Sequence, residues 1–145
     1  MKEIDVEEAY KLIKSPVIIA TKGKSSYDLT PIGWVMPYDY EPVTKALFAS
    51  SPEHQADANI RRSKEFAILI PKDAAGALVA NTGSVSGATV DKFEKFDIKA
   101  HKAKKIDVMI PDDEISAVIE CKMTKVQAEG SVDLIFGSAL CAYEF

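Results

Sequence analysis

The chain has 145 residues, of which 47% are hydrophobic and 28% charged, a composition ordinary for a single globular domain over residues 1–145. No apolar run approaches the ~20 residues that cross a bilayer, and the N-terminus lacks the apolar core of a signal peptide. We therefore expect a cytoplasmic protein without a membrane partner. A net charge of −4 gives no reason to expect nucleic acid as a partner, and the two cysteines and two histidines lie too far apart to favour a metal site.

The first predicted elements are a short helix and a strand. Asp5 and Glu8 have the spacing of a capping box, and the apolar residues of Val6–Ile13 recur at helical spacing. Pro16 is expected to end this helix. The β-branched run Val17–Thr21 then predicts the first strand.

The next predicted strand, Thr30–Tyr38, is irregular. It contains Pro31, Gly33 and Pro37. A proline or glycine inside a strand indicates an edge, a bulge or a backbone that a ligand approaches closely.

The middle of the chain alternates between strands and helices. A strand is expected over Val43–Ala49, and Ser50–Glu53 has the serine, proline and acid of a helix start. This helix is expected to end near Ser63. The apolar run Glu65–Ile70 predicts a fully buried strand, and Ala74–Asn81 predicts a second short helix.

The C-terminal third is typical of a hairpin. Apolar and polar residues alternate over Ile115–Thr124, which predicts a half-buried strand, and again over Val132–Phe136 after a turn at Glu129-Gly130. The alternation breaks near Lys125-Val126, which indicates a bulge. The chain lacks the regular β-α-β alternation of a Rossmann fold and has no glycine-rich nucleotide-binding motif. The pattern therefore predicts a mainly β, small-barrel fold with two or three short flanking helices.

The sequence offers no catalytic triad, carboxylate pair or metal cluster, so we predict no catalytic side chain and expect a cofactor to carry any chemistry. The predicted helix start is one candidate site. Its free N–H groups, with the hydroxyls of Ser50 and Ser51, would suit a phosphate that His54 and Gln55 also reach, although the same residues can simply cap a helix. Arg62 suits bidentate phosphate recognition, or it can complement the helix dipole.

Two further segments could contact a cofactor. Gly33 permits close backbone approach and Trp34 offers a large ring, although a lone tryptophan often lies in a core. The small, hydroxyl-rich loop 81–93 could follow a polyhydroxylated chain, with Lys92 balancing a phosphate, or could be an ordinary connection. The basic stretch 99–105 is either a solvated edge or a surface that steers an anion.

The order of these segments resembles the flavin reductase-like, FMN-binding split-barrel family, and within it the flavoredoxin-type branch. The spacing Gly83-x-x-Ser86-Gly87-x-x-x-Asp91-Lys92-Phe93 is the most specific part of the resemblance. The other matching pieces are Pro16-Val17, Thr30–Trp34, Pro42-Val43, Ser51–Arg62, Glu65-Phe66 and Ile119–Lys122.

The resemblance implies a Greek-key split β-barrel that binds FMN non-covalently, in a homodimer with the flavin at the interface. It implies an enzyme in which NADH or NADPH gives a hydride to flavin N5. The alternatives are a flavoredoxin-like protein that exchanges electrons with a redox protein partner, a pyridoxamine-phosphate-oxidase-like enzyme, or a binding module on the same barrel.

The resemblance also assigns residues to the cofactor. The segment Thr30–Trp34 would run beside the isoalloxazine, the turn Ser50–Gln55 would hold the phosphate, and Lys92 would lie near the anionic end of the flavin. The full cofactor-binding set comprises Thr30, Pro31, Ile32, Gly33, Trp34, Ala49, Ser50, Ser51, His54, Gln55, Asn59, Arg62, Ser86, Gly87 and Lys92.

Two segments depart from the family pattern. Relatives commonly carry asparagine where this chain has Asp28, and a carboxylate cannot donate a hydrogen bond as an amide does. Relatives usually show a basic residue and a threonine in the phosphate turn, where this chain has His54 and Gln55. By the same resemblance, we expect the chain to lack the C-terminal extension that in longer relatives helps to shape the nicotinamide side.

Overall fold

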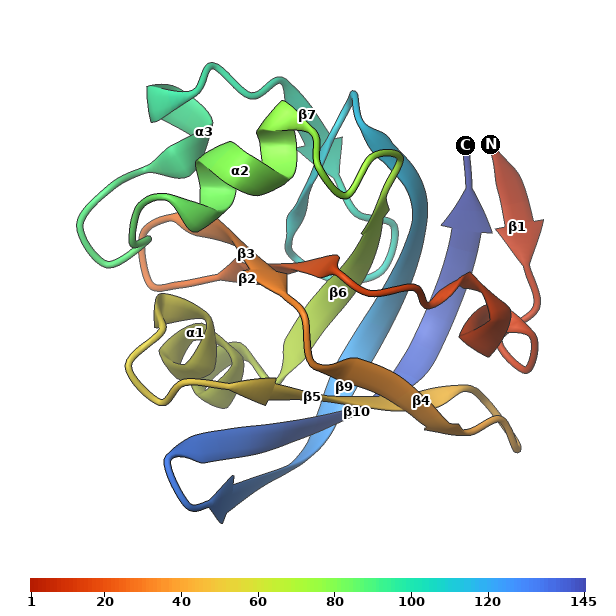
Figure 1. The fold of residues 1–145 in the computed structure, drawn as a ribbon. Coiled ribbons are helices and arrows are strands. Elements are labelled where there is room, and N and C mark those ends of the chain that lie inside the picture. The colour runs from red at the N-terminus through yellow and green to blue at the C-terminus, as the bar shows by residue number, and fades with distance from the viewer.

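The computed structural model describes residues 1–145 as one curled antiparallel sheet flanked by short helices (Figure 1). The strands of this sheet follow the order β3-β2-β6-β9-β10-β5-β4, and β1 pairs with β10. Their bounds are β1 (Lys2–Ile4), β2 (Val17–Lys22), β3 (Tyr27–Ile32), β4 (Val35–Asp39), β5 (Lys45–Ser50), β6 (Glu65–Pro71), β9 (Ile115–Glu129) and β10 (Val132–Glu144). A separate pair is β7 (Ala100–Lys102) and β8 (Met109–Pro111), and the helical segments are η1 (Ala9–Leu12), α1 (Gln55–Ser63), α2 (Ala77–Gly83) and α3 (Lys92–Lys95).

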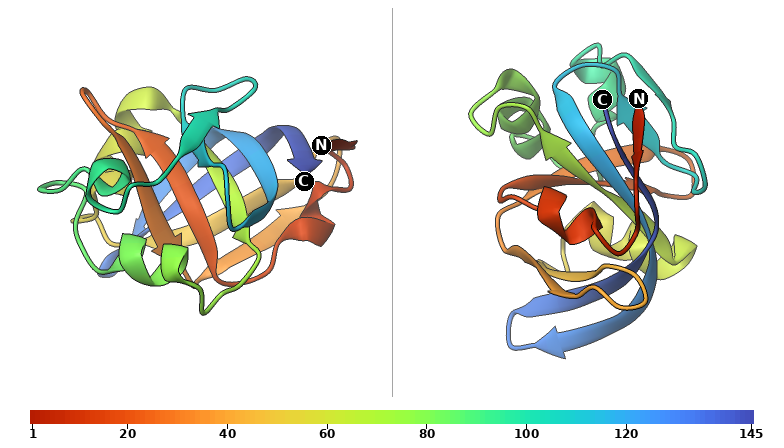
Figure 2. Two further views of the ribbon diagram at one scale, coloured as in Figure 1. Left: turned by 90° about the horizontal axis from the view of Figure 1, so that it is seen from above. Right: turned by 90° about the vertical axis from the view of Figure 1, so that its right-hand side faces the viewer.

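Two long strands join the halves of the sheet. β9 pairs with β6 through Ile115–Lys122 and with β10 along nearly its whole length, while β10 pairs with β5 through Asp133–Ser138. The strands at the two ends of the order, β3 and β4, follow each other directly in the chain, so the sheet curls into a barrel (Figure 2). The predicted mainly β split barrel with short helices is therefore confirmed.

The core consists of two apolar clusters on opposite faces of the central strands. One cluster, which includes Phe48, Phe66 and Ile135, has 16 buried residues. The other, which includes Val108 and Tyr143, has 12 buried residues. Because both faces of β9 are covered, the prediction that it is half-buried is wrong over its first half.

The predicted helix from Asp5 is also wrong. Residues Lys2–Ile4 form a strand on β10, and only the single 3₁₀ turn η1 follows. The Asp5 side chain caps nothing, whereas its carbonyl accepts a hydrogen bond from the Glu8 N–H at 2.8 Å. The backbone after Asp5 bonds to Thr44 instead of to itself: the Thr44 N–H donates to the Val6 carbonyl at 2.7 Å, and the Tyr10 N–H donates to the Thr44 hydroxyl at 2.9 Å. These long-range contacts, which a local pattern does not reveal, take precedence over the helical spacing.

The other corrections concern boundaries. The irregular strand Thr30–Tyr38 is two strands, β3 and β4, separated at Gly33-Trp34. Helix α1 begins at Gln55 with His54 as N-cap, since the preceding serine and proline residues form a turn in which the His54 N–H donates to the Ser51 carbonyl at 3.0 Å.

Further along the chain, α2 begins at Ala77, and α3, β7 and β8 were not predicted. The bulge lies beside its predicted position, between Lys125 and Met123, where the register against β10 shifts. No helix of the chain is both long enough and apolar enough to cross a membrane.

A buried carboxylate fixes the long connection between α3 and β9. Glu120 has no exposed surface, and it accepts hydrogen bonds from the N–H groups of Lys104, Lys105 and Ile106 at 2.8, 2.6 and 3.1 Å. The Tyr143 hydroxyl donates a fourth, at 2.7 Å. Burial, together with this carboxylate, raises the pKa of the Tyr143 phenol well above its usual value. Segment 104–106 is thereby attached to β9, beside β10.

We expect Glu120→Gln to lower the free energy of unfolding by about 2–4 kcal/mol, because the new amide NH₂ would face backbone donors in a buried site. Urea denaturation of both proteins measures the difference. The matched control is Glu129→Gln in the exposed hairpin turn, expected to change stability by less than about 0.5 kcal/mol. Equal, small effects for the two variants would contradict the structural role of Glu120.

Candidate functional site

One continuous groove runs between β3, the start of α1 and the loop that follows α2. It consists of an apolar hollow of about 320 Å³, a central pocket of about 260 Å³ and an outer hollow of about 310 Å³. Pro31 and His54 line both the apolar hollow and the central pocket, while Gln55 and Gly87 line both the central pocket and the outer hollow. These shared residues make the three hollows one groove.

The apolar hollow is formed by the turn between β3 and β4. Trp34 is 75% exposed, so its ring lies outside the core and faces solvent beside the hollow. A Cβ on Gly33 would meet no atom of the chain within 4 Å, which leaves the backbone open on this side. The turn is held by the Ser15 hydroxyl, which donates to the Gly33 carbonyl, and by the Ala49 N–H, which donates to the Trp34 carbonyl at 2.9 Å. The hollow thus presents a fixed apolar surface to a flat ligand.

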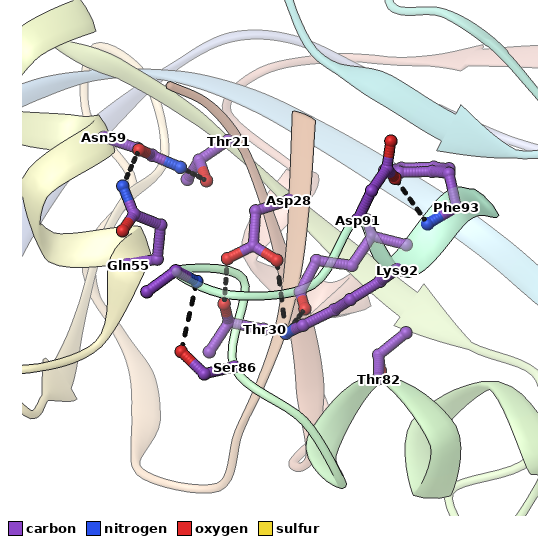
Figure 3. A network of polar contacts seen from close by, with 12 residues as sticks. Thr21, Asp28, Thr30, Gln55, Asn59, Thr82, Ser86, Asp91, Lys92 and Phe93 are labelled. Carbon is purple, nitrogen blue, oxygen red and sulfur yellow. Dashed lines mark hydrogen bonds and ion pairs between the residues drawn. The ribbon is translucent and has the colours of Figure 1, made fainter. Parts of the chain in front are cut away.

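The central pocket has a buried ion pair at its base. The Lys92 Nζ lies 3.2 Å from Asp28 Oδ1, and each residue is only 3% exposed (Figure 3). The same ammonium donates to the Leu29 carbonyl at 2.6 Å, and the Thr30 hydroxyl donates to Asp28 Oδ2 at 3.3 Å. Four hydroxyl side chains also line the pocket, those of Thr30, Thr82, Ser84 and Ser86.

The loop over this ion pair requires a glycine. A Cβ built on Gly87 would lie 2.5 Å from the carboxylate atoms of Asp28, so any other residue would push the loop away. The Ser86 hydroxyl accepts a hydrogen bond from the Ala88 N–H at 3.1 Å, which keeps the loop tight. The Ser86-Gly87 sequence is thus explained by contact with Asp28.

Helix α1 is anchored beside the groove by a chain of amides. The Gln55 side-chain amide donates to Asn59 Oδ1 at 2.8 Å, and Asn59 Nδ2 donates to the Thr21 hydroxyl at 3.0 Å (Figure 3). Both hydrogen bonds are internal, so Asn59 acts in the structure as an anchor of α1 on β2.

The outer hollow is the cationic end of the groove. It is lined by Lys24 from the turn between β2 and β3 and by Arg62 from α1. Arg62 Nη2 donates to the carbonyls of Lys22 and Gly23 at 3.1 and 2.9 Å, which ties this turn to the helix. Arg61, by contrast, is bound to Asp57 and Asp133 at 2.7 and 2.8 Å and does not line the groove.

The groove brings together the residues that the sequence predicted for a cofactor, with one exception. Ser50 is 1% exposed and its hydroxyl donates to the Ser51 carbonyl, so it lies beneath the groove. Sequence reasoning missed Lys24 and the hairpin residue Val132, since a polar turn and a distant strand carry no signal of their own for a shared site.

The basic stretch 99–105 lies outside the groove, and acidic residues neutralise much of its charge. Lys102 pairs with Asp107, and His101 with Asp112 at 2.6 Å. Lys102 and the Tyr27 hydroxyl lower the pKa of Asp107 to about 2. This supports the interpretation of the stretch as a solvated edge.

Neither cysteine has the character of a nucleophile. Burial raises the pKa of the Cys141 thiol to about 11 and raises that of Cys121 further, so both thiols remain protonated at neutral pH. The groove therefore offers surfaces and hydrogen bonds for a bound group, and no side chain of its own for covalent chemistry.

Comparison with known proteins identifies relatives over nearly the whole chain. A family model described as "Flavin reductase like domain" matches residues 10–143. The uncharacterized protein YddH of Escherichia coli (strain K12) is 24% identical over 144 residues, which cover 96% of this chain and 76% of YddH.

Solved structures show the same fold at low sequence identity. An FMN-binding domain of a flavin reductase-like enzyme from Shewanella baltica OS155 has a TM-score of 0.83 at 18% identity, with 98% of this chain and 75% of that chain covered. A flavoredoxin from Methanosarcina acetivorans has a TM-score of 0.78 at 19% identity, with 90% and 68% covered.

The open face of Gly33 gives a direct test of the groove. We expect Gly33→Val to weaken binding of FMN, the ligand expected from the sequence, at least about tenfold, because the added side chain would enter the apolar hollow. Quenching of flavin fluorescence measures the affinity. The melting temperature of the variant should stay within a few degrees of the wild-type value, because no protein atom is displaced. An unchanged affinity for FMN would show that the isoalloxazine ring does not lie in the apolar hollow.

Proposed function

The chain belongs to the flavin reductase-like family, and on this premise we propose that it is an oxidoreductase that holds FMN non-covalently in the groove. The observation that carries the proposal is the change in polarity along the groove. Next to Trp34 the lining is apolar, in the central pocket it is rich in hydroxyl groups, and beside Lys24 and Arg62 it is cationic. FMN has the same order of parts: a flat ring, a polyhydroxylated ribityl chain and a phosphate.

The groove residues have distinct roles in this proposal. The turn at Gly33-Trp34 would orient the isoalloxazine and exclude water from one face, and the hydroxyls of Thr30, Ser84 and Ser86 would bind the ribityl chain. FMN, when bound, supplies the redox chemistry by accepting a hydride at N5. The chain contributes position and electrostatics, with no side chain acting as nucleophile or general base.

The reductant we propose is a reduced nicotinamide. The matched family is described as flavin reductase-like, and the apolar hollow is open beside Trp34, where a second planar ring could stack. The cytoplasmic location expected from the sequence stays a prediction.

Anaerobic mixing of the FMN-loaded protein with NADH or NADPH tests this reductant. We expect the flavin absorbance to bleach in a single turnover with at least one of the two. Persistent absorbance with both would contradict the reductase proposal.

A second candidate is electron transfer to or from a protein, as in flavoredoxins. The structural similarity to flavoredoxins from Methanosarcina acetivorans and Desulfovibrio vulgaris (Miyazaki F) favours it. Reduction by a ferredoxin-type donor, with no reaction toward either nicotinamide, would select this candidate over the first.

We further propose that a second copy of the chain covers the edge strand β4. Large apolar side chains along and beside this strand are unusually exposed: Trp34 at 75%, Met36 at 51%, Tyr38 at 44% and Tyr40 at 54%. Met36, Tyr38 and Tyr40, with Tyr10, also line a further hollow of about 420 Å³. An apolar edge strand left uncovered would promote aggregation. Because Trp34 belongs to both this edge and the groove, the flavin would lie at the interface.

If β4 forms the dimer interface, a charge introduced at Met36 should weaken the dimer. Met36→Glu should shift the protein toward a monomer, because it would bury a charge between the two copies. Light scattering coupled to gel filtration measures the mass. Lys72→Glu, which changes charge at an exposed position remote from β4, is the control and should leave the mass unchanged. A monomeric wild-type protein would contradict the proposal.

A further inference from the structure

We propose that the positive charge that holds the anionic tail of the ligand comes from Lys24 and Arg62 in the outer hollow. Lys92 does not take this role, because its charge is neutralised by Asp28. The inference rests on the proposed function, because the tail concerned is the phosphate of FMN. It identifies the residues by which the protein would distinguish FMN from riboflavin, which has the same ring and ribityl chain without the phosphate.

The first step concerns the charge of the central pocket. Lys92 is the only cation that lines this pocket apart from any charge on His54, and its ammonium is committed to Asp28 at 3.2 Å and to the Leu29 carbonyl at 2.6 Å. Asp28 and Lys92 are both almost fully buried, so neither exchanges its partner for water. Since the two charges cancel, the base of the pocket is neutral.

The second step concerns what an anion would meet there. Asp28 Oδ1 is buried and has no hydrogen-bond donor in proper geometry, although the ammonium is near. The Gly87 backbone packs on the same carboxylate, where even a Cβ would approach to 2.5 Å. A phosphate that reached Lys92 would therefore lie beside a carboxylate, whose repulsion offsets the attraction of the ammonium at similar distance.

The third step concerns the outer hollow, which has positive charge and no acidic residue in its lining. Lys24 is exposed, and it is absent from the ion pairs of the chain, whereas its neighbour Lys22 pairs with Asp107. Arg62 holds the turn that carries Lys24 through its bonds to the carbonyls of Lys22 and Gly23, and these bonds use only Nη2. Ser25 and Ser26 add hydroxyl groups to the same hollow. A guanidinium, an ammonium and hydroxyls are the groups that bind a phosphate monoester.

The experiment compares FMN with riboflavin on the full chain. The measured quantity is the ratio of the riboflavin Kd to the FMN Kd, obtained by fluorescence quenching for each variant, with thermal unfolding to confirm that the variant is folded. We expect Lys24→Gln to lower this ratio about three- to tenfold, and the charge-conserving Lys24→Arg to preserve it.

Two variants test the part played by Asp28. Asp28→Asn releases the Lys92 charge into the pocket and should raise the ratio. The double variant Asp28→Asn, Lys92→Gln removes both charges, so the two Kd values should change together and the ratio should stay within about twofold.

The outcomes separate this inference from the proposed function. Retained discrimination in Lys24→Gln, together with its loss in the double variant, would show that Lys92 holds the phosphate and would overturn the inference while FMN binding stands. Failure of the wild-type protein to bind either flavin would refute the proposed function, and the inference with it.

Discussion

The geometry of the groove depends on the buried ion pair between Asp28 on β3 and Lys92 at the start of α3 (Figure 3). A charge buried alone costs several kcal/mol, so each residue requires the other, and the two segments are held together. The Asp91 carboxylate, which accepts hydrogen bonds from the N–H groups of Phe93 and Glu94, orients the helix that carries Lys92. The loop above must then pass close to Asp28, which only Gly87 permits. One interaction thus places the base and the covering loop of the central pocket.

The remainder of the site is built on more rigid parts of the barrel. Asn59 links α1 to β2, and the two-sided core behind β2, β6 and β9 fixes the strands from which the turn at Trp34 projects. Binding residues therefore lie at strand ends, in loops and at the first turn of a helix, while the sheet determines their spacing. This arrangement suits a protein whose task is to position a cofactor that performs the chemistry.

Much of the fold could be predicted from the sequence because its signals are local. β-branched runs, the C-terminal alternation and turn residues such as Gly130 specify strands and hairpins without reference to distant residues. The N-terminal strand could not be predicted in this way, since its pairing with β10 joins the two ends of the chain. The helical pattern that follows it is overridden by the hydrogen bonds that Val6 and Tyr10 form with the distant Thr44. The start of α1 was missed for a different reason, because a local turn, closed by the His54 N–H donating to the Ser51 carbonyl, delays the helix.

The candidate site shows a similar division. The resemblance to a family identified the segments that meet in the groove, and their spacing in the sequence was sufficient for this. The chemistry within the groove depended on side-chain partners: Lys92 is neutralised by Asp28, Asn59 is an internal anchor, and Lys24 contributes charge from a turn that carries no motif. The structure is most informative at Asp28, where it shows the ion pair with Lys92 that the sequence did not predict.

The central claim is that the groove binds FMN, and titration of the purified protein with FMN tests it most directly. The account predicts a saturable change in the visible flavin spectrum at equimolar FMN and chain, with the flavin co-eluting with the protein on gel filtration. An unchanged spectrum, with all of the FMN eluting as free ligand, would contradict it.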